Sequence, residues 1–475
     1  MMTDLAEESN SANKDHSVIQ VREEGERREI EISDVGNQTL SGNETNKDEL
    51  LASLIEKKLP QEFPKPDPTC IFRVPNKLGR DNENVFVPQV VPIGPYHHGG
   101  KKFEAMEQIK LWNLQCLLKR QPTPETCLVK FVEEIRSKEE FLRNCYDEKL
   151  GDHLSSDQFV EMMVVDGCFI LELIRKDNPI SIYDDVFSMP EMLSIVKNDL
   201  FLLENQLPWK VLDCLFNLTK ESGEISLYRQ TLPLIGGVMP NWMITDYQIV
   251  VSIVDKERET WQFRHLLDNA GDFLVGSLSR NKDRPRRYGF WDPIPSVTHL
   301  EEIGVKFQLA SFETELLGIT FNREKGVMEI PRMIIGANTE CVLRNLIAYE
   351  RCSMKPHYIL SYAMLLNQLI KSTKDLDSLV QKGIVLTNLS KEDTVSLFNR
   401  LCDDTASILF VYSQLALDVY FYNRDRWLRR WLARIKSNYL YNPSSIWLVS
   451  NAVIIILILT IMQTLYSILA YYKQN

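Results

Sequence analysis

The chain has 475 residues, of which 44% are hydrophobic and 25% are charged, which is ordinary for a globular protein. Its formal net charge is −11 and no basic stretch runs through its middle, so the sequence excludes the usual nucleic-acid binders. Its nine cysteines form no Cys-x-x-Cys pair, which predicts reduced thiols and neither a metal nor a cofactor.

The beginning of the chain is acidic. The first 50 residues hold 13 acidic and 5 basic residues and no aromatic residue. Such a segment cannot bury enough apolar surface to offset the entropy lost on ordering, so we predict a disordered tail over residues 1–46. A short amphipathic helix at 48–58 and a proline-rich linker are expected within 47–69. No basic or apolar leader opens the chain, so no signal peptide is expected.

Residues 70–420 are predicted to form one multi-helix globular body of the mainly α (α+β) class. Apolar residues recur at helical spacing from near Phe103 and over 129–144, 157–174, 200–218, 345–349, 358–370, 394–401 and 407–430. The segment 157–174 is apolar nearly all round, which predicts a central helix capped by Asp157. Short strands at 305–309, 319–321 and 327–335 predict a small antiparallel β element.

The C-terminal residues predict a membrane anchor. No charged residue lies between Ser437 and Tyr472, and the run from Ile446 to Ala470 is long enough to cross a hydrocarbon core of about 30 Å. Tyr439, Tyr441 and Trp447 flank one end, and Tyr466, Tyr471 and Tyr472 flank the other, as at membrane interfaces. We therefore predict a transmembrane helix at 446–470 and a short far-side tail at 471–475. With no signal peptide, the chain is expected to insert after translation as a single-pass, tail-anchored membrane protein.

The juxtamembrane segment 421–445 is basic. Its cationic residues are Arg424, Arg426, Arg429, Arg430, Arg434 and Lys436, whereas only Lys473 follows the helix. The positive-inside rule therefore puts the N-terminal side in the cytosol, with plasma membrane and endomembrane both open. Trp427 and Trp431 share a helix face, so the segment also suits anionic lipid headgroups. Glycosylation sequons argue for the opposite orientation and lie at Asn37, Asn43, Asn217 and Asn388.

Two features look catalytic. His97 and His98 are adjacent and would point to opposite sides of an extended chain, which favours a structured loop over a metal site. Asp166 lies inside the central helix, where it is either a general acid or base with a raised pKa or a buried, paired carboxylate. The paired carboxylate is favoured, because buried ionisable groups in large folds usually have a partner.

A third polar group is formed by Glu204, Asn205 and Gln206, just before Pro208. It is either a ligand site or, as we favour, a hydrogen-bond hub between two helices. The sequence contains no Walker motif, no Gly-x-Ser-x-Gly elbow and no His-Glu-x-x-His motif. The chain is therefore not expected to be an enzyme, although a spatially assembled site needs no fixed spacing.

Several short motifs together resemble the plant-specific family catalogued as domain of unknown function 247. They are IFRVP (71–75), VPQVVPIGPYHHG (87–99), MEQIK (106–110), CYDE (145–148), FVEMMVVDGCFILEL (159–173), DLFLLENQLPW (199–209), HLLD (265–268) and RNLIAYE (344–350). The motif positions expected to be structural are Pro75, Gly94, Pro95, Tyr96, His97, His98, Asp166, Gly167, Glu204, Asn205, Gln206 and Pro208. The resemblance implies a membrane-associated plant protein without established catalytic activity.

Three hypotheses of function follow. The first is a non-enzymatic, membrane-anchored interaction protein whose partners are the lipid bilayer and an unidentified protein. The second is a cell-surface or pollen recognition determinant, because some grass members of the family are similar to proposed male determinants of self-incompatibility. The third is an enzyme of unrecognised class working with His97, His98 and Asp166, which requires these side chains to converge.

Overall fold

The computed structural model describes residues 43–58, 68–75, 78, 83–121, 123–147, 154–176, 190–238, 263–275, 292–311, 317–353, 355–402, 410–435 and 443–474. The chain divides into two units, Met1–Pro66 and Asp67–Asn475. The acidic tail predicted for residues 1–46 lies outside the described residues except for 43–46. Lys436 and the linker residues 59–67 also lie outside them.

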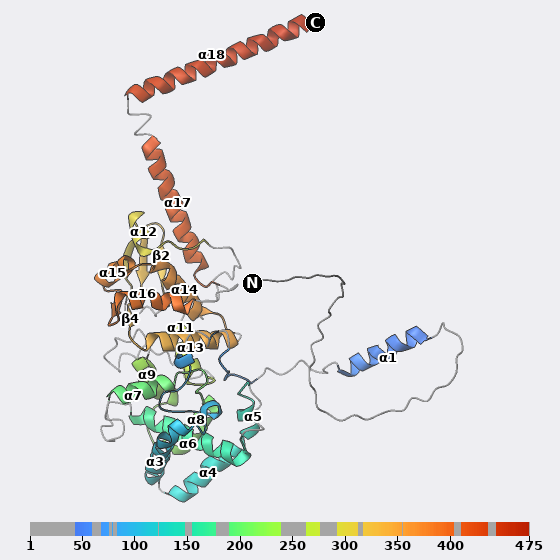
Figure 1. Ribbon diagram of the computed structural model, residues 1–475, viewed down its shortest axis with the longest axis vertical. Helices are drawn as coiled ribbons and strands as arrows, with labels where there is room; N and C mark the ends of the chain where they lie inside the picture. Colours follow the sequence, from blue (N-terminus) through green and yellow to red (C-terminus); the bar gives the residue numbers. More distant parts are fainter. Residues whose placement is uncertain are drawn as a thin grey trace, which may run out of the picture. The chain divides into compact units, whose positions relative to one another are not determined.

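In the first unit the described residues form one helix, α1 (Asn43–Lys58), which includes the helix expected at 48–58 (Figure 1). Four apolar side chains on it are between 47% and 62% exposed: Leu50, Leu51, Leu54 and Ile55. A lone helix of this length is marginal in water, because most helix stability comes from packing. The described part of this unit therefore contains little that could hold α1 together by itself.

The second unit is mainly helical, and the predicted fold class is confirmed. Its shorter elements are the 3-10 turns η1 (Glu83–Val85), η2 (Pro95–His97) and η3 (Lys101–Phe103). Its α-helices, shown in Figure 1, are α3 (Glu104–Lys119), α4 (Pro124–Arg136), α5 (Glu139–Arg143), α6 (Ser156–Lys176), α7 (Pro190–Asp199), α8 (Trp209–Thr219), α9 (Leu227–Val238), α11 (Leu266–Val275), α12 (Val297–Glu302), α13 (Thr339–Cys352), α14 (Tyr358–Leu369), α15 (Thr373–Gln381), α16 (Lys391–Leu401), α17 (Ser413–Ile435) and α18 (Pro443–Gln474).

Helix α6 is the centre of the N-terminal half of the body. It packs against α3, α4, α8 and α9, and fifteen of its residues are buried. Gly167 sets its distance from α8, because a Cβ atom there would lie 2.6 Å from Leu215 Cδ1 and 3.0 Å from Val211 Cγ1. A methyl group at that position would push the two helices apart, so the glycine allows the close packing.

Two small sheets lie in the C-terminal half. The first orders its strands β1 (Lys306–Leu309), β3 (Val327–Ile330) and β2 (Thr320–Asn322). The second pairs β4 (Met333–Ile335) with β5 (Val385–Thr387). The expectation of antiparallel pairing holds for β2 and β3 only, since β1–β3 and β4–β5 pair in parallel.

Several predicted boundaries are corrected. The segment 129–144 is two helices, and the first begins at Pro124, whose fixed φ suits the first turn. Asp157 lies inside α6, and Ser155 Oγ accepts the N–H of Gln158 at 3.3 Å instead. The segment 200–218 is helical only from Trp209, because the preceding residues form turns.

The C-terminal helix α18 includes the predicted span 446–470. Within it Ser450–Ala470 is long and apolar enough to cross a membrane, with a mean hydropathy of 2.4 and none of it buried. Helix α17 precedes it and packs its first half on the body through β2. The basic residues predicted at 424–434 therefore lie on a helix that begins on the body.

Candidate functional site

The end of α7 and the turn between α7 and α8 carry the polar residues Asp199, Glu204, Asn205 and Gln206. Together with Asp166 of α6 we call them the polar hub. Asp166, Asp199, Asn205 and Gln206 are each at most 2% exposed. Because a buried polar group is costly without a hydrogen-bond partner, the partners of these side chains show what the hub does.

Asp199 binds the backbone of the N-terminal segment of the body, by which we mean residues 68–75 and 83–97. Its carboxylate accepts the N–H groups of Gln89, Val90 and Val91 at 2.9, 2.7 and 2.9 Å. Burial raises the pKa of Asp199, and the three N–H donors act against that rise by stabilising the carboxylate. The side chain thus fixes three consecutive residues that belong to no helix or strand.

The two amides of the hub continue this role. Asn205 Oδ1 accepts the N–H of Ile93 at 2.7 Å, and its Nδ2 donates to the carbonyl of Val91 at 2.9 Å. Gln206 Oε1 accepts the N–H of Leu267 at 3.1 Å, while its Nε2 donates to two carbonyls of its own turn at 2.7 and 2.9 Å. The amides therefore join the turn to the N-terminal segment on one side and to α11 on the other.

Asp166 is a paired carboxylate. Its Oδ1 is 2.7 Å from Lys110 Nζ, and its Oδ2 accepts the N–H of Gly94 at 2.8 Å. Lys110 also donates to Glu107 at 2.8 Å and to the carbonyl of Pro92. Burial raises the pKa of Asp166 against the opposing effect of Lys110, whereas the two carboxylates outweigh burial and raise the pKa of Lys110.

Gly94 is where the N-terminal segment comes closest to the hub. Its φ is 71°, a left-handed conformation that glycine adopts readily. A Cβ atom at Gly94 would lie 2.6 Å from the carbonyl oxygen of Gln206. Glycine is therefore required both by its backbone angle and by this approach, and Pro95 next to it begins η2.

Glu204 is the more accessible member of the hub, with its side chain 14% exposed. It accepts the N–H of Val74 at 2.8 Å and pairs with Arg73 at 3.1 Å. His97 Nε2 lies 3.4 Å from Glu204 Oε2, without the directed geometry of a hydrogen bond. Burial alone would raise the pKa of Glu204, but these neighbours outweigh it and lower the pKa.

Tyr96 and Asp147 extend this half-exposed cluster. The Tyr96 hydroxyl donates to Asp147 Oδ1, and Asp147 Oδ2 accepts the N–H of Arg73 at 2.9 Å. The Arg73 guanidinium lies over the Tyr96 ring, 4.1 Å from its centroid. The motifs around residues 71–75, 94–100 and 145–148 therefore meet at one place on the body.

The candidate catalytic residues have no direct contact with one another that the structure records. In the part of the chain that the structure describes, no hydrogen bond or ion pair joins His97 or His98 to Asp166. His98 is exposed. Pro75 and Pro208 take part in backbone hydrogen bonds. The carbonyl of Pro75 accepts the N–H of Leu78 at 2.8 Å, and that of Pro208 accepts the N–H of Val211 at 2.9 Å.

A second buried cluster binds the start of the N-terminal segment. His265 Nε2 donates to the carbonyl of Cys70 at 3.0 Å, because its Nδ1 accepts the N–H of Asp268 at 3.2 Å. Burial lowers the pKa of His265 to about 4, so the ring is neutral near pH 7. Asp268 accepts from Tyr349 at 2.6 Å and pairs with Lys355.

The sequence motifs include further residues to which sequence reasoning gave no role of their own: Lys110, Asp199, His265, Asp268 and Asn345. Asn345 Oδ1 accepts the N–H of Leu203 at 2.8 Å, which connects α13 to the α7–α8 turn. The role of Lys110 could have been predicted from the sequence, because Lys110 falls on the buried face of α3 between Met106 and Leu114. A lysine in such a position needs an acidic partner.

A shallow hollow lies on the exposed side of α3. It has a volume of about 390 Å³ and is lined by Gln108, Leu111, Trp112, Leu114, Gln115 and Leu118. Trp112 is 50% exposed there. The lining contains no titratable side chain, and the described residues contain no group of three or more His, Cys, Asp or Glu that could hold a metal ion.

The fold and the hub define a mainly helical body whose motif residues bind its own backbone. The chain belongs to the DUF247 family, described as plant protein of unknown function, whose model matches residues 71–459. It is similar to UPF0481 protein At3g47200 of Arabidopsis thaliana, with 27% identity over 85% of this chain and 87% of the relative. It is also similar to Putative UPF0481 protein At3g02645 of the same plant, with 21% identity over 86% and 92%. No solved structure matches the chain.

Proposed function

We propose that this protein is a non-enzymatic, membrane-anchored interaction protein whose body faces the cytosol. The observation that carries the proposal is α18, where the apolar stretch Ser450–Ala470 has no buried residue. Side chains such as Val453, Ile456 and Leu459 are more than half exposed. Since burying apolar surface is the main favourable contribution to folding, a helix of this kind needs a bilayer around it.

The non-enzymatic part of the proposal is supported by the polar hub. The two oxygens of Asp166 and the two of Asp199 are all occupied by groups of the same chain. A general acid or base must instead reach the proton it transfers. The hub residues therefore act as parts of the fold, and the surface of the body remains for partners.

The cytosolic orientation is supported by charge. Arg429, Arg430, Arg434 and Lys436 lie 10 to 17 residues before Ile446, where the predicted span begins, against one lysine after it. Basic residues within about 15–20 residues of a span are retained on the cytosolic side.

Protease protection on sealed microsomes carrying the full chain tests this proposal. The expected result is that added protease digests the body and that glycosidase causes no change in mass. Asn217 and Asn388 are exposed, so both sequons could accept a glycan if the body were lumenal. A protected body that loses mass on deglycosylation would favour the cell-surface recognition determinant. The variant with all four sequons removed, Asn37→Gln, Asn43→Gln, Asn217→Gln, Asn388→Gln, is the matched control for that mass change.

A partner is sought by proximity labelling with the full chain in plant cells. The control is a ligase carried by a different single-span anchor in the same membrane. Proteins labelled only by the full chain would support an interaction role. Identical labelled sets would count against it.

A further inference from the structure

Helix α17 uses one side to bind the body. Leu415, Val419 and Tyr422 are buried, and the Tyr422 hydroxyl donates to the carbonyl of Gly304 at 3.0 Å. Arg426 continues the same side and donates to the carbonyl of Ile303 at 2.8 Å. The spacings of four, three and four residues place these positions on one side of an α-helix, which we call the inner face.

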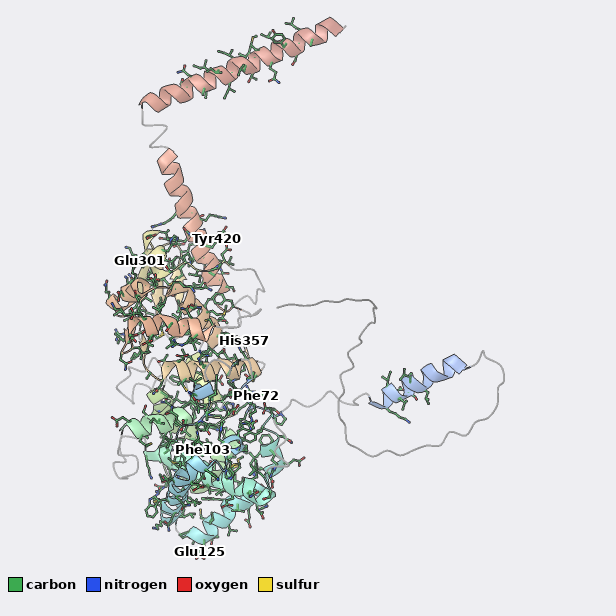
Figure 2. The ribbon with its side chains drawn as sticks, viewed as in Figure 1. Phe72, Phe103, Glu125, Glu301, His357 and Tyr420 are labelled. Atoms are coloured by element: carbon green, nitrogen blue, oxygen red, sulfur yellow. The ribbon has the colours of Figure 1, made fainter. Side chains whose placement is uncertain are left out.

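The opposite side, the outer face, is turned away from the body. Tyr420 lies there with 43% exposure, and the side chain of Arg424 is 49% exposed (Figure 2, which labels Tyr420). At about 100° per residue, the outer face continues through the following apolar positions. They are Trp427, Leu428, Trp431, Leu432 and Ile435.

The inner face changes from mostly apolar to basic beyond Tyr422. Beyond Arg426 the sequence continues this side with Arg429 and Arg430, and Arg434 lies at its edge, next to the outer face. A helix with an aromatic and aliphatic side and an arginine-rich opposite side is typical of helices that lie in a membrane interface. By helical spacing, the apolar positions of 427–435 lie opposite the side by which α17 binds the body, so a surface covering them would leave the body on the water side.

The distance to the span is short. Eight Cα–Cα steps connect Ile435 to Pro443, where α18 begins, so their separation is at most about 28 Å. The 23-residue α17 is itself about 34 Å long. If α18 spans the bilayer, the second half of α17 is therefore within reach of the headgroups.

We propose that the second half of α17, residues 427–435, lies flat on an anionic bilayer, the same bilayer that α18 spans, with the body above it. The arginines select anionic headgroups as the occupant of this surface, because each basic residue near such a membrane gains attraction that a neutral surface does not supply. This inference rests on the proposed membrane anchor and adds a second, lipid-selective contact to it.

Hydrogen exchange of the full chain in nanodiscs tests the inference. One set of discs contains phosphatidylcholine alone, and the other contains about one-third phosphatidylserine. The backbone amides of 427–435 are expected to exchange at least about tenfold more slowly in the anionic discs, since three arginines gain attraction that phosphatidylcholine does not supply. The amides of α18 should be protected equally in both.

A charge variant tests whether the arginines cause the slower exchange in anionic discs. The triple change Arg429→Gln, Arg430→Gln, Arg434→Gln should remove the difference between the two kinds of disc. The matched control Lys130→Gln, Lys371→Gln, Lys374→Gln changes three exposed or half-exposed lysines of the body and should keep it. Equal exchange of 427–435 in both discs, with α18 protected, would overturn this inference alone. Rapid exchange throughout α18 in both discs would overturn the anchor and the inference together.

Discussion

The N-terminal segment of the body and the C-terminal helix α18 are stabilised in opposite ways. The segment belongs to few regular elements and is fixed by side chains such as Asp166, Asp199 and Asn205, each bonded to its backbone. Helix α18 has regular backbone bonds but no buried residue in its apolar stretch. Recognisable motifs thus mark where the fold depends on particular side chains, whereas the segment that we assign to the membrane needs only apolar character.

The variant with the largest expected effect on the free energy of unfolding breaks the buried ion pair between Lys110 and Asp166. Lys110→Met leaves Asp166 without its cation in a buried site and should lower the free energy of unfolding by about 3–5 kcal/mol. Denaturant unfolding of the full chain in detergent measures the change. Replacing both residues, with Lys110→Met and Asp166→Leu, should restore part of it because no unpaired charge remains.

The control for that test is an exposed pair. Arg136 and Asp157 lie 2.6 Å apart with side chains 43% and 86% exposed. Asp157→Ala should cost less than about 1 kcal/mol. If Lys110→Met were as mild as Asp157→Ala, the hub would not be holding the N-terminal segment.

Acid should weaken the second cluster through His265. Its pKa is about 4 in the folded chain, below the usual 6.5, so the unfolded chain binds more protons between these values. Stability therefore falls as the pH drops through this window, and His265 should account for about 3 kcal/mol between pH 7 and pH 4. Measuring the free energy of unfolding of the chain and of its His265→Gln variant at pH 7 and pH 4 isolates the contribution of His265. An equal loss in both proteins would contradict the buried neutral ring.

A smaller difference in stability is expected between two glycine variants. It distinguishes the cost of backbone strain from the cost of a close contact. Gly94 and Gly99 have φ angles of 71° and 74°, but a Cβ atom meets the carbonyl of Gln206 only at Gly94. Gly94→Ala should therefore be less stable than Gly99→Ala by about 2 kcal/mol, since only it forces the backbone to shift. Thermal unfolding of the two variants measures the difference, and equal stabilities would show that the contact relaxes freely.

Much of the fold could be predicted, because helical periodicity is local. The predicted strand at 327–335 is divided by Pro331, which the apolar pattern alone did not reveal. Strand β5 was not predicted, because its three residues, Val385–Thr387, are too few to show an alternation of apolar and polar residues. Its parallel pairing with β4 depends on a partner about fifty residues away.

The polar groups were harder to interpret than the helices. Asp166 stood out within an apolar helix, yet its partner Lys110 lies on another helix 56 residues earlier. The partners of Asp199 and Asn205 are backbone N–H groups, which every residue possesses and which no sequence pattern distinguishes. Sequence could therefore indicate which side chains are buried but not what they bind.

The most direct measurement for the central claim is glycosylation of an acceptor sequence appended on a spacer after Asn475. The account predicts that this added site is glycosylated in microsomes, while Asn217 and Asn388 are not. That result would place the C-terminus in the lumen and the body in the cytosol, with α18 between them. An unmodified added site together with glycans on Asn217 or Asn388 would contradict it.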